Sequence, residues 1–360
     1  MSSAQFGSVS LYPSLHRAIA DVVGTGVDRK LLLVGDSTTY GYEGLIGLGP
    51  AGMLTKLLIA AGIPAALGLV IPPGDLGAAV NDTRWGVGTG WSNPGGAQGW
   101  GSAATVWAAG GSTAADSLTF TPSGGYSYDT FDIYFVGNTL TGNVSVNVDG
   151  GTATVIDTTL GTNGLGKTTI TCPAATNHVV NFGLTTTYTY ILGVEGYLST
   201  TPKLRVANAG VDSTATGNWN GTAGNWSGLN CIEQYAPDVT IIDLGINDAD
   251  TSVTLATYLT NLLAIVTAAK LSGDVIIASP NPINPTETGN PGLLTSYVSA
   301  LAGFCSTNDC GFLDLYNRWG GQNAWNVLDP LGWYYDNLHP SAAIGYPDIA
   351  RAELAALVSL

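Results

Sequence analysis

The sequence predicts an α/β protein in which helices cover both faces of a parallel sheet and an all-β sandwich is inserted. Outside the middle of the chain, short apolar runs that end in Gly alternate with segments whose apolar residues recur at helical spacing. This pattern is typical of buried parallel strands and their covering helices. Between about residues 100 and 200, short alternating segments replace the helical spacing. The chain of 360 residues is also longer than the roughly 150 residues of a typical single domain.

Compact apolar runs predict the buried strands. The first covers residues 30–35, of sequence Lys-Leu-Leu-Leu-Val-Gly, and a helix at 11–23 precedes it. Further strands are predicted at 204–207, 238–245, 273–279 and 311–315, and further helices at 53–61, 254–271, 293–304 and 344–360. Because strand and helix alternate, we expect these strands to run parallel to one another.

The middle of the chain is typical of an antiparallel sandwich. Six short segments of alternating polarity lie at 117–121, 131–136, 143–148, 168–172, 178–183 and 190–197. Gly, Asn and Asp residues separate them, as in the run Asp-Gly-Gly at 149–151, and such regular spacing favours a β-sandwich. We therefore expect an α/β domain at residues 1–100 and 203–360, interrupted by a β-sandwich at 101–202.

The composition excludes several classes of partner. The net charge is -15, and only 11 residues are Lys or Arg, with no basic run. Phosphate backbones and anionic membranes are bound by clustered cations, so we expect neither nucleic acid nor an anionic membrane surface as a partner. Charged residues make up 10% of the chain, and Gly, Thr, Ser and Asn are abundant. A neutral or acetylated polymer, or a small ester, fits this composition better.

The sequence gives few indications of where in or outside the cell the protein is located. No apolar run approaches the roughly 18 residues of a membrane span, and the first ten residues do not resemble a secretory signal peptide. We expect an extracellular or virion-associated protein whose signal was removed or which is released by another route. Cys305 and Cys310 lie close together in the sequence, and a disulfide and two buried thiols both remain open for them.

Residues suited to catalysis follow the predicted strands or precede the last helix. They form the segments Gly-Asp-Ser at 35–37, Asn-Ala-Gly at 208–210, Gly-Ile-Asn-Asp at 245–248 and Asp-Asn-Leu-His-Pro at 336–340. Open α/β sheets place their sites at the carboxyl ends of strands, so we expect the four segments to converge. Together they supply a hydroxyl, an imidazole, a carboxylate and amide donors, which are the groups that acyl transfer requires.

In this order, the four segments resemble the four sequence blocks of the SGNH hydrolases, also called the GDSL esterase/lipase superfamily. The resemblance covers roughly residues 28–95 and 203–360, and it implies a flavodoxin-like three-layer sandwich for the α/β part. It does not cover the inserted sandwich, which departs from the minimal pattern of the family. That insertion resembles a carbohydrate-binding module only by analogy of fold.

The resemblance implies a role for each matching residue. Ser37 would attack the ester carbonyl, His339 would move the proton, and Asp336 would orient His339 and stabilise its charged form. The oxyanion hole would consist of the backbone amides of Ser37 and Gly210 and the side-chain amide of Asn247. No cluster of metal-ligating residues is visible in the sequence, so we expect neither a metal ion nor a cofactor.

Aromatic residues suggest a carbohydrate substrate. Trp333, Tyr334 and Tyr335 directly precede Asp336, and we predict them as substrate contacts because exposed aromatic rings stack on sugars. Other tryptophans in Gly- and Asn-rich segments could do the same or could pack loops onto the core: Trp85, Trp91, Trp100, Trp219 and Trp226.

The sequence therefore favours a serine esterase that acts as a carbohydrate O-deacetylase. One alternative is a non-catalytic protein that binds glycans, such as an adhesin or a phage tail surface protein. A virion-borne deacetylase would combine the two. A protein that only binds glycans need not keep Ser37, His339 and Asp336 together, so their arrangement discriminates between these functions.

Overall fold

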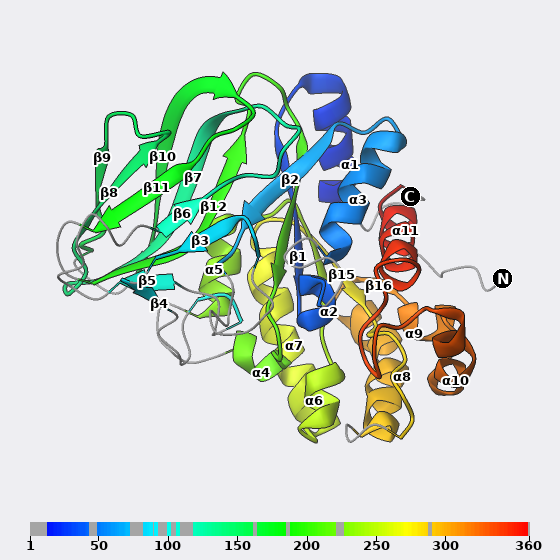
Figure 1. Ribbon diagram of the computed structural model, residues 1–360. Helices are drawn as coiled ribbons and strands as arrows, with labels where there is room; N and C mark the ends of the chain where they lie inside the picture. Colours follow the sequence, from blue (N-terminus) through cyan, green and yellow to red (C-terminus); the bar gives the residue numbers. More distant parts are fainter. Residues whose placement is uncertain are drawn as a thin grey trace.

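The computed structural model contains one mixed sheet and one antiparallel sheet (Figure 1). It describes residues 13–42, 49–72, 82–88, 90–92, 99–101, 106–108, 118–160, 164–184, 188–220, 227–286 and 290–358. The parallel part of the mixed sheet has the order β2-β13-β1-β14-β15-β16. Its strands are β1 (Arg29–Gly35), β2 (Ala65–Val70), β13 (Leu204–Gly210), β14 (Val239–Asp243), β15 (Asp274–Ala278) and β16 (Gly311–Leu313).

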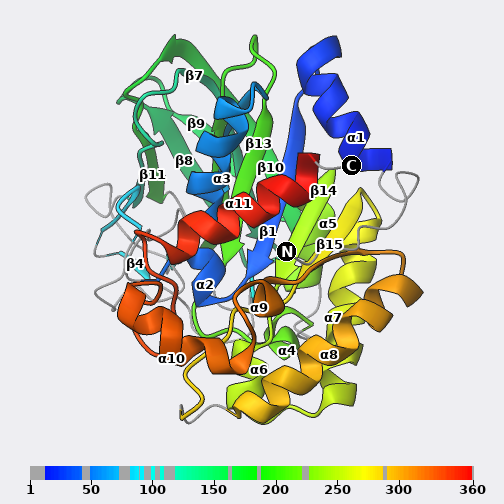
Figure 2. The ribbon, with the colours of Figure 1, turned by 90° about the vertical axis from the view of Figure 1, so that its right-hand side faces the viewer.

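Two apolar cores lie on opposite faces of this parallel sheet. Leu31 and Leu33 of β1 belong to one core, whereas Leu32 and Val34 belong to the other, because successive side chains of a strand point to opposite faces. The first core is covered by α1 (Pro13–Ala20), α3 (Gly49–Ala60) and α11 (Gly345–Val358), and the second by α5 (Gly228–Tyr235), α7 (Leu255–Lys270) and α8 (Pro291–Thr307). Figure 2 shows α11 lying across the first face. The predicted three-layer α/β arrangement is confirmed.

Within the described residues, each helix that the sequence predicts is present to within a few residues. The shorter helices are α2 (Ser37–Tyr40), α4 (Thr216–Trp219), α6 (Ile246–Asp250), α9 (Leu315–Arg318) and α10 (Trp325–Leu328), with a π-helical turn at Asp21–Thr25 and 3₁₀ turns at Gln322–Ala324 and Asp329–Leu331. In the part of the chain that the structure describes, no helix combines the length and apolar character needed to cross a membrane.

The strands from the middle of the chain do not form a separate sandwich. Three of them, β7 (Tyr128–Gly137), β10 (Gly164–Ala175) and β12 (Thr189–Tyr197), extend the mixed sheet, because β12 pairs antiparallel with β2 at Val194 and Val70. The second layer is a five-stranded antiparallel sheet with the order β3-β6-β11-β8-β9. Two antiparallel layers are thus present as predicted, but one of them continues the parallel sheet.

The strands of the second layer are short. They are β3 (Trp85–Val87), β6 (Leu118–Phe120), β8 (Asn143–Val148), β9 (Thr154–Asp157) and β11 (Val180–Leu184). Two other short strands, β4 (Trp91–Ser92) and β5 (Val106–Ala108), belong to the mixed sheet, in which β5 pairs with β12 and β4 with β5. The apolar residues of the second layer pack against those of β7 and β12 in a third core, which includes the fully buried Phe131 and Phe182. This core joins the two layers.

A buried ion pair crosses the junction between the inserted strands and the parallel sheet. Glu195 on β12 and Arg205 on β13 lie on either side of β2, with 3.2 Å between Arg205 Nη1 and Glu195 Oε2. The Tyr235 hydroxyl donates a hydrogen bond of 2.9 Å to Glu195. Gly68 on β2 leaves room for this crossing, since a Cβ atom there would lie 3.1 Å from Glu195 Oε1.

Four of the tryptophans considered for sugar stacking are core residues. Trp85, Trp91, Trp100 and Trp219 are at most 6% exposed, and the Trp85 and Trp100 indoles donate to backbone carbonyls. For these four the stacking hypothesis is wrong, and they pack the loops onto the core. Trp226 lies outside the described residues.

The four cysteines of the chain are free thiols. Cys305 and Cys310 are both buried, and the Cys310 amide donates to the Cys305 carbonyl at 2.9 Å. Of the two possibilities that the sequence left open for this pair, the structure has two buried thiols.

Candidate functional site

Ser37 lies where the central strand of the parallel sheet ends. β1 finishes at Gly35, and α2 begins at Ser37 with Asp36 as its N-cap, whose Oδ1 accepts a hydrogen bond of 2.9 Å from the Thr38 amide. The ends of β13 and β14 lie on either side, because Gly35 is in register with Gly210 and Asp243. The carboxyl ends of three neighbouring strands therefore surround Ser37, as the sequence predicts.

Two glycines allow the α2 turn to pack directly onto these strand ends. A Cβ atom on Gly35 would lie 1.9 Å from Thr39 Oγ1, and one on Gly210 would lie 2.1 Å from the Tyr40 amide nitrogen. Both contacts are far too short for real atoms. A side chain at either position would therefore move the turn that carries Ser37.

A chain of hydrogen bonds connects Ser37, His339 and Asp336. The distance from His339 Nε2 to Ser37 Oγ is 2.8 Å, and the distance from His339 Nδ1 to Asp336 Oδ2 is also 2.8 Å. Ser37 and His339 are about nine-tenths buried, at 8% and 9% exposure. The structure thus brings the predicted nucleophile, base and orienting carboxylate together.

The loop that carries Asp336 and His339 is fixed by its own backbone. Asp336 Oδ1 accepts hydrogen bonds from the amides of Leu338 and His339, at 2.8 and 2.7 Å. Tyr334 and Pro340 form an isolated antiparallel bridge that closes the loop. A neighbouring loop also holds it, since Asn281 Nδ2 donates to the Leu338 carbonyl at 3.0 Å.

Asp336 ionises more readily than an ordinary aspartate. Its partial burial would raise the pKa, but the hydrogen bonds from the His339 side chain and from the backbone amides of His339 and Leu338 outweigh this effect, so the pKa lies below its ordinary value. A carboxylate accepting several N–H bonds is stabilised in its charged form. Asp336 can therefore hold the Nδ1 proton of His339 across the neutral and mildly acidic range.

Tyr42 is a neighbour of His339 that the sequence does not predict. Its ring stacks on the imidazole, with 4.2 Å between the ring centroids and 28° between the planes. Tyr42 follows Ser37 by only one helical turn, but no pattern in the sequence indicates which ring it would cover.

The predicted oxyanion donors differ in availability. The Ser37 amide lies at the first position of α2, where a helical turn leaves N–H groups without an intrahelical acceptor. Asn247 Nδ2 donates to the Thr214 carbonyl at 3.0 Å and to Asp36 Oδ2 at 3.3 Å, so both of its N–H groups have acceptors and the longer bond is the one to the residue before Ser37.

The Gly210 amide does not fit its predicted role in this structure. It donates a hydrogen bond of 2.8 Å to Asn208 Oδ1, and Gly210 itself is buried in β13 against the Tyr40 backbone. Its N–H is therefore already bonded inside the fold. The glycine is needed here for close packing, a requirement that the sequence pattern does not distinguish from an open oxyanion site.

The three aromatic residues before Asp336 have different environments. Tyr334 is 6% exposed and donates to the Pro282 carbonyl at 2.7 Å, so this residue supports the loop and its predicted substrate contact does not match the structure. Trp333 is half-buried and packs edge-on against Trp319, with 5.2 Å between ring centroids. Tyr335 is 55% exposed, and of the three it is the ring most open to solvent.

Three buried carboxyl groups, those of Asp36, Asp243 and Glu353, lie close enough to interact electrostatically. Burial raises the pKa of Asp36 to about 6 and that of Glu353 on α11 to about 8. The pKa of Asp243 is raised well above its ordinary value, first by burial and then by the nearby Asp36 and Glu353. Glu353 is 4% exposed and its Oε2 has no hydrogen-bond partner among the described residues.

Glu353→Gln is expected to stabilise the protein at neutral pH and to have little effect near pH 4. The pKa of Glu353 is about 8 in the folded state and about 4.3 when unfolded. A raised pKa favours folding below the unfolded value, and this contribution falls as pH rises towards the folded value. Urea unfolding should show a gain of about 4–5 kcal/mol at pH 8 and of less than about 1 kcal/mol at pH 4.5. An equal gain at both pH values, or the same gain from the exposed control Glu233→Gln, would contradict this explanation.

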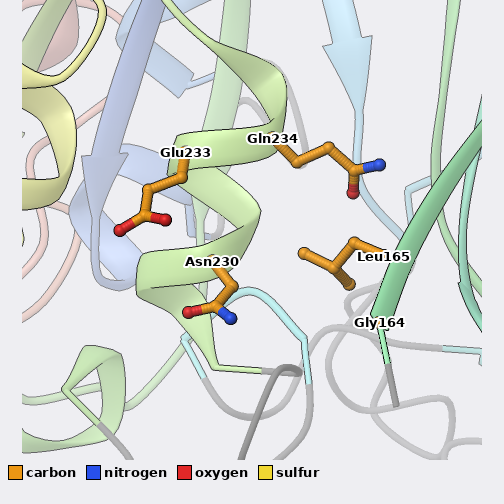
Figure 3. Close-up of a pocket in the computed structure, with 5 residues that line it drawn as sticks. All are labelled: Gly164, Leu165, Asn230, Glu233 and Gln234. Carbon is orange, nitrogen blue, oxygen red and sulfur yellow. The ribbon is translucent and has the colours of Figure 1, made fainter. Parts of the chain in front are cut away.

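A surface depression lies elsewhere, between β10 and α5. Its volume is about 380 Å³, and it is lined by Gly164, Leu165, Asn230, Glu233 and Gln234 (Figure 3). None of the predicted site residues lines it. The depression is therefore separate from the Ser37 site.

The chemistry of the Ser37 site follows from these contacts. A buried hydroxyl is hydrogen-bonded to an imidazole, the imidazole to an ionised carboxylate, and the Asn247 side-chain amide is bonded to the residue before the hydroxyl-bearing serine. A hydroxyl, base and orienting group in this arrangement form the template for nucleophilic acyl transfer.

Comparison with known proteins agrees with this chemistry. Residues 173–344 match the model of the GDSL-like Lipase/Acylhydrolase family. This segment contains Gly210, Asn247, Asp336 and His339, and Ser37 lies before it. None of the curated proteins compared with the chain matches it.

Among solved structures, the fold is similar to that of a peptidoglycan O-acetylesterase. That match has a TM-score of 0.76 and 19% identity, and it covers 98% of each chain. A lipase/acylhydrolase from Enterococcus faecalis matches with a TM-score of 0.43 and 13% identity, over 91% of this chain and 95% of that one. An acetylxylan esterase from Geobacillus stearothermophilus matches with a TM-score of 0.35 and 22% identity, over 43% and 73%.

Proposed function

Because the chain belongs to the GDSL-like lipase/acylhydrolase family and is a carboxylic ester hydrolase, we propose that it is a serine esterase that removes acetyl groups from a carbohydrate. Ser37, His339 and Asp336 carry the reaction. The observation that supports this assignment most strongly is the pair of 2.8 Å hydrogen bonds that joins the three side chains.

Acylation begins when Ser37 Oγ attacks the ester carbonyl and passes its proton to His339 Nε2. Asp336 holds the Nδ1–H of His339, so that Nε2 is the free base before the attack, and it stabilises the imidazolium afterwards. The bond between the acyl carbon and the sugar oxygen then breaks, the Nε2 proton moves to that oxygen to give the sugar hydroxyl, and the acyl group stays on Ser37. A water molecule activated by His339 releases acetate and restores Ser37.

The negative oxygen of the tetrahedral intermediate is stabilised by the Ser37 amide and by Asn247. In this proposal the Asn247 amide stays oriented by its 3.0 Å bond to the Thr214 carbonyl and exchanges its longer, 3.3 Å bond to Asp36 for one to the oxyanion. Preorganised donors of this kind act mainly on the transition state.

Asn247→Ala is expected to lower kcat by about 100-fold while KM changes little, because the oxyanion forms only in the transition state. Steady-state kinetics on p-nitrophenyl acetate measure both constants. Asn220→Ala, a substitution in another Asn that hydrogen-bonds a neighbouring helix, serves as the control. A change confined to KM would place Asn247 in ground-state binding instead.

Two observations support an acetylated polysaccharide as the substrate, and peptidoglycan in particular. The similarity to the peptidoglycan O-acetylesterase extends over 98% of this chain, inserted strands included. The chain also has a net charge of -15 with few cations, which suits a substrate that offers neutral acetyl esters and hydroxyls. An extracellular or virion-associated location, where such a polymer is met, is part of this proposal.

A protein that only binds glycans is less well supported. Such a protein gains nothing from a Ser37–His339–Asp336 chain with both hydrogen bonds at 2.8 Å. A virion-borne deacetylase remains compatible with the same site, since it differs in location and not in chemistry.

The proposal is tested by acetate release. The protein is incubated with O-acetylated peptidoglycan, with acetylated xylan and with samples of both that were de-esterified by mild base. We expect acetate from O-acetylated peptidoglycan, none from the de-esterified samples, and none from either polymer with Ser37→Ala.

Simple esters complete the test. The rate on p-nitrophenyl esters should fall from acetate to octanoate if the site takes short acyl groups. Hydrolysis of octanoate alone, or Ser37-dependent hydrolysis of small esters without acetate release from either polymer, would overturn the assignment to carbohydrate deacetylation.

A further inference from the structure

We propose that Tyr42 is a positioning residue for His339, whose ring restrains the imidazole and stabilises it when it is charged. This inference rests on the proposed function, because it assigns Tyr42 a part in the proton transfer from Ser37. It begins from the stacked contact, in which the ring centroids are 4.2 Å apart.

The hydrogen bonds of His339 leave one motion of its ring weakly restrained. Nδ1 is bound to Asp336 and Nε2 to Ser37, and both bonds lie near the plane of the imidazole. A tilt about the line through the two nitrogens changes neither distance much. The Tyr42 ring, which lies 28° from parallel over one face, opposes this tilt, so the lone pair of Nε2 stays aimed at the Ser37 hydroxyl.

Tyr42 is attached to the same turn as the nucleophile. Gly41 ends α2 with a φ of 93°, a left-handed conformation that favours glycine and turns the chain back. The Tyr42 amide then donates to the Ser37 carbonyl at 3.0 Å, and its own carbonyl accepts from the Tyr346 hydroxyl at 3.2 Å. The ring that covers His339 is therefore fixed relative to Ser37.

The contact also changes the balance between neutral and charged imidazole. His339 takes up the Ser37 proton during attack and is then a cation against the face of an electron-rich ring. Such a ring attracts a cation through its quadrupole, and an interaction of this type corresponds to about a threefold to thirtyfold effect on an equilibrium. Tyr42 therefore favours the charged form that the transition state requires.

The experiment compares Tyr42→Leu and Tyr42→Phe. Loss of the ring in Tyr42→Leu should lower kcat for p-nitrophenyl acetate by about tenfold with KM within about twofold. It should also move the acid limb of kcat/KM to lower pH, because the imidazolium is less stabilised. Tyr42→Phe keeps the ring face and should restore both properties to near the wild-type values.

A second readout does not depend on the substrate. The rate at which a fluorophosphonate probe labels Ser37, measured against pH, should show the same loss and the same shift in Tyr42→Leu. Tyr42→Met, which keeps apolar volume without a ring, replaces Tyr42→Leu if the latter does not fold. Tyr126→Leu, at a partly buried tyrosine packed on the third core, controls for a general loss of packing.

The outcomes are distinct. Equal losses in Tyr42→Phe and Tyr42→Leu, a change in KM alone, or a lower kcat without a shift of the acid limb would each overturn the role of the ring. Labelling of Ser37 that responds to Tyr42 as expected, without acetate release from any polymer, would support this inference and contradict the proposed substrate. A wild-type protein that shows neither labelling of Ser37 nor ester hydrolysis would contradict the proposed function itself.

Discussion

Ser37→Ala is expected to lower the kcat for p-nitrophenyl acetate by a factor of about 10³ or more, because the variant lacks the atom that forms the acyl-enzyme in the proposed mechanism. Removing the nucleophile of a serine hydrolase leaves only the residual effect of the oxyanion donors and of substrate binding. Steady-state hydrolysis of p-nitrophenyl acetate measures this loss directly.

The fold should survive the substitution. Among the residues that the structure describes, the Ser37 hydroxyl makes one hydrogen bond, to His339, and such a bond contributes about 1 kcal/mol to stability. A thermal melt of Ser37→Ala should therefore lie within a few degrees of the wild type. Ser296→Ala, on the exposed side of α8, is the control for serine removal. More than a few per cent of the wild-type turnover in Ser37→Ala would exclude Ser37 as the nucleophile.

Glu195→Leu is expected to cost about 3–5 kcal/mol of unfolding free energy, which is the largest loss of stability that we predict. Glu195 is 0% exposed and Arg205 7% exposed, so the substitution leaves a buried guanidinium without its carboxylate. It also removes the acceptor of the Tyr235 hydroxyl. Urea unfolding of the variant and the wild type gives the difference.

Two further variants separate this cause from others. Asp348→Asn weakens the more exposed Arg318–Asp348 pair and should cost no more than about 1 kcal/mol. Glu195→Leu with Arg205→Met removes both charges and should recover much of the lost unfolding free energy. The reason is that the loss comes from the buried Arg205 charge left without a partner, more than from the absence of the ion pair. A double variant as unstable as Glu195→Leu would argue against a charge effect.

Much of the α/β part could be predicted because its signals are local. The apolar run of β1 and the helical spacing of α7 are each contained in fewer than about twenty residues, and both depend on burial against neighbours of any identity. The convergence of Ser37 with His339 and Asp336 also followed, because the carboxyl ends of parallel strands share one edge.

Long-range pairings and local hydrogen bonds could not be predicted in the same way. Nothing near Val194 or Val70 indicates that these residues pair and join two sheets. The Gly210 amide fits an oxyanion donor by its position in the sequence, yet its direction depends on the Asn208 side chain. For Trp85 and Trp100 the sequence left both sugar stacking and core packing open, and burial prevails because it removes such large apolar surfaces from water.

The continuous mixed sheet has a consequence for the synthesis of the protein. β1 is translated early, but its two neighbours β13 and β14 begin at Leu204 and Val239. The residues of β1 therefore leave the ribosome long before those of β13 and β14. Until then, the backbone groups of β1 cannot form their hydrogen bonds to the neighbouring strands. Contacts between residues so distant in sequence slow folding, and unpaired strand edges are prone to aggregation in the meantime. We expect the nascent chain to depend on chaperones until the residues of β14 have emerged.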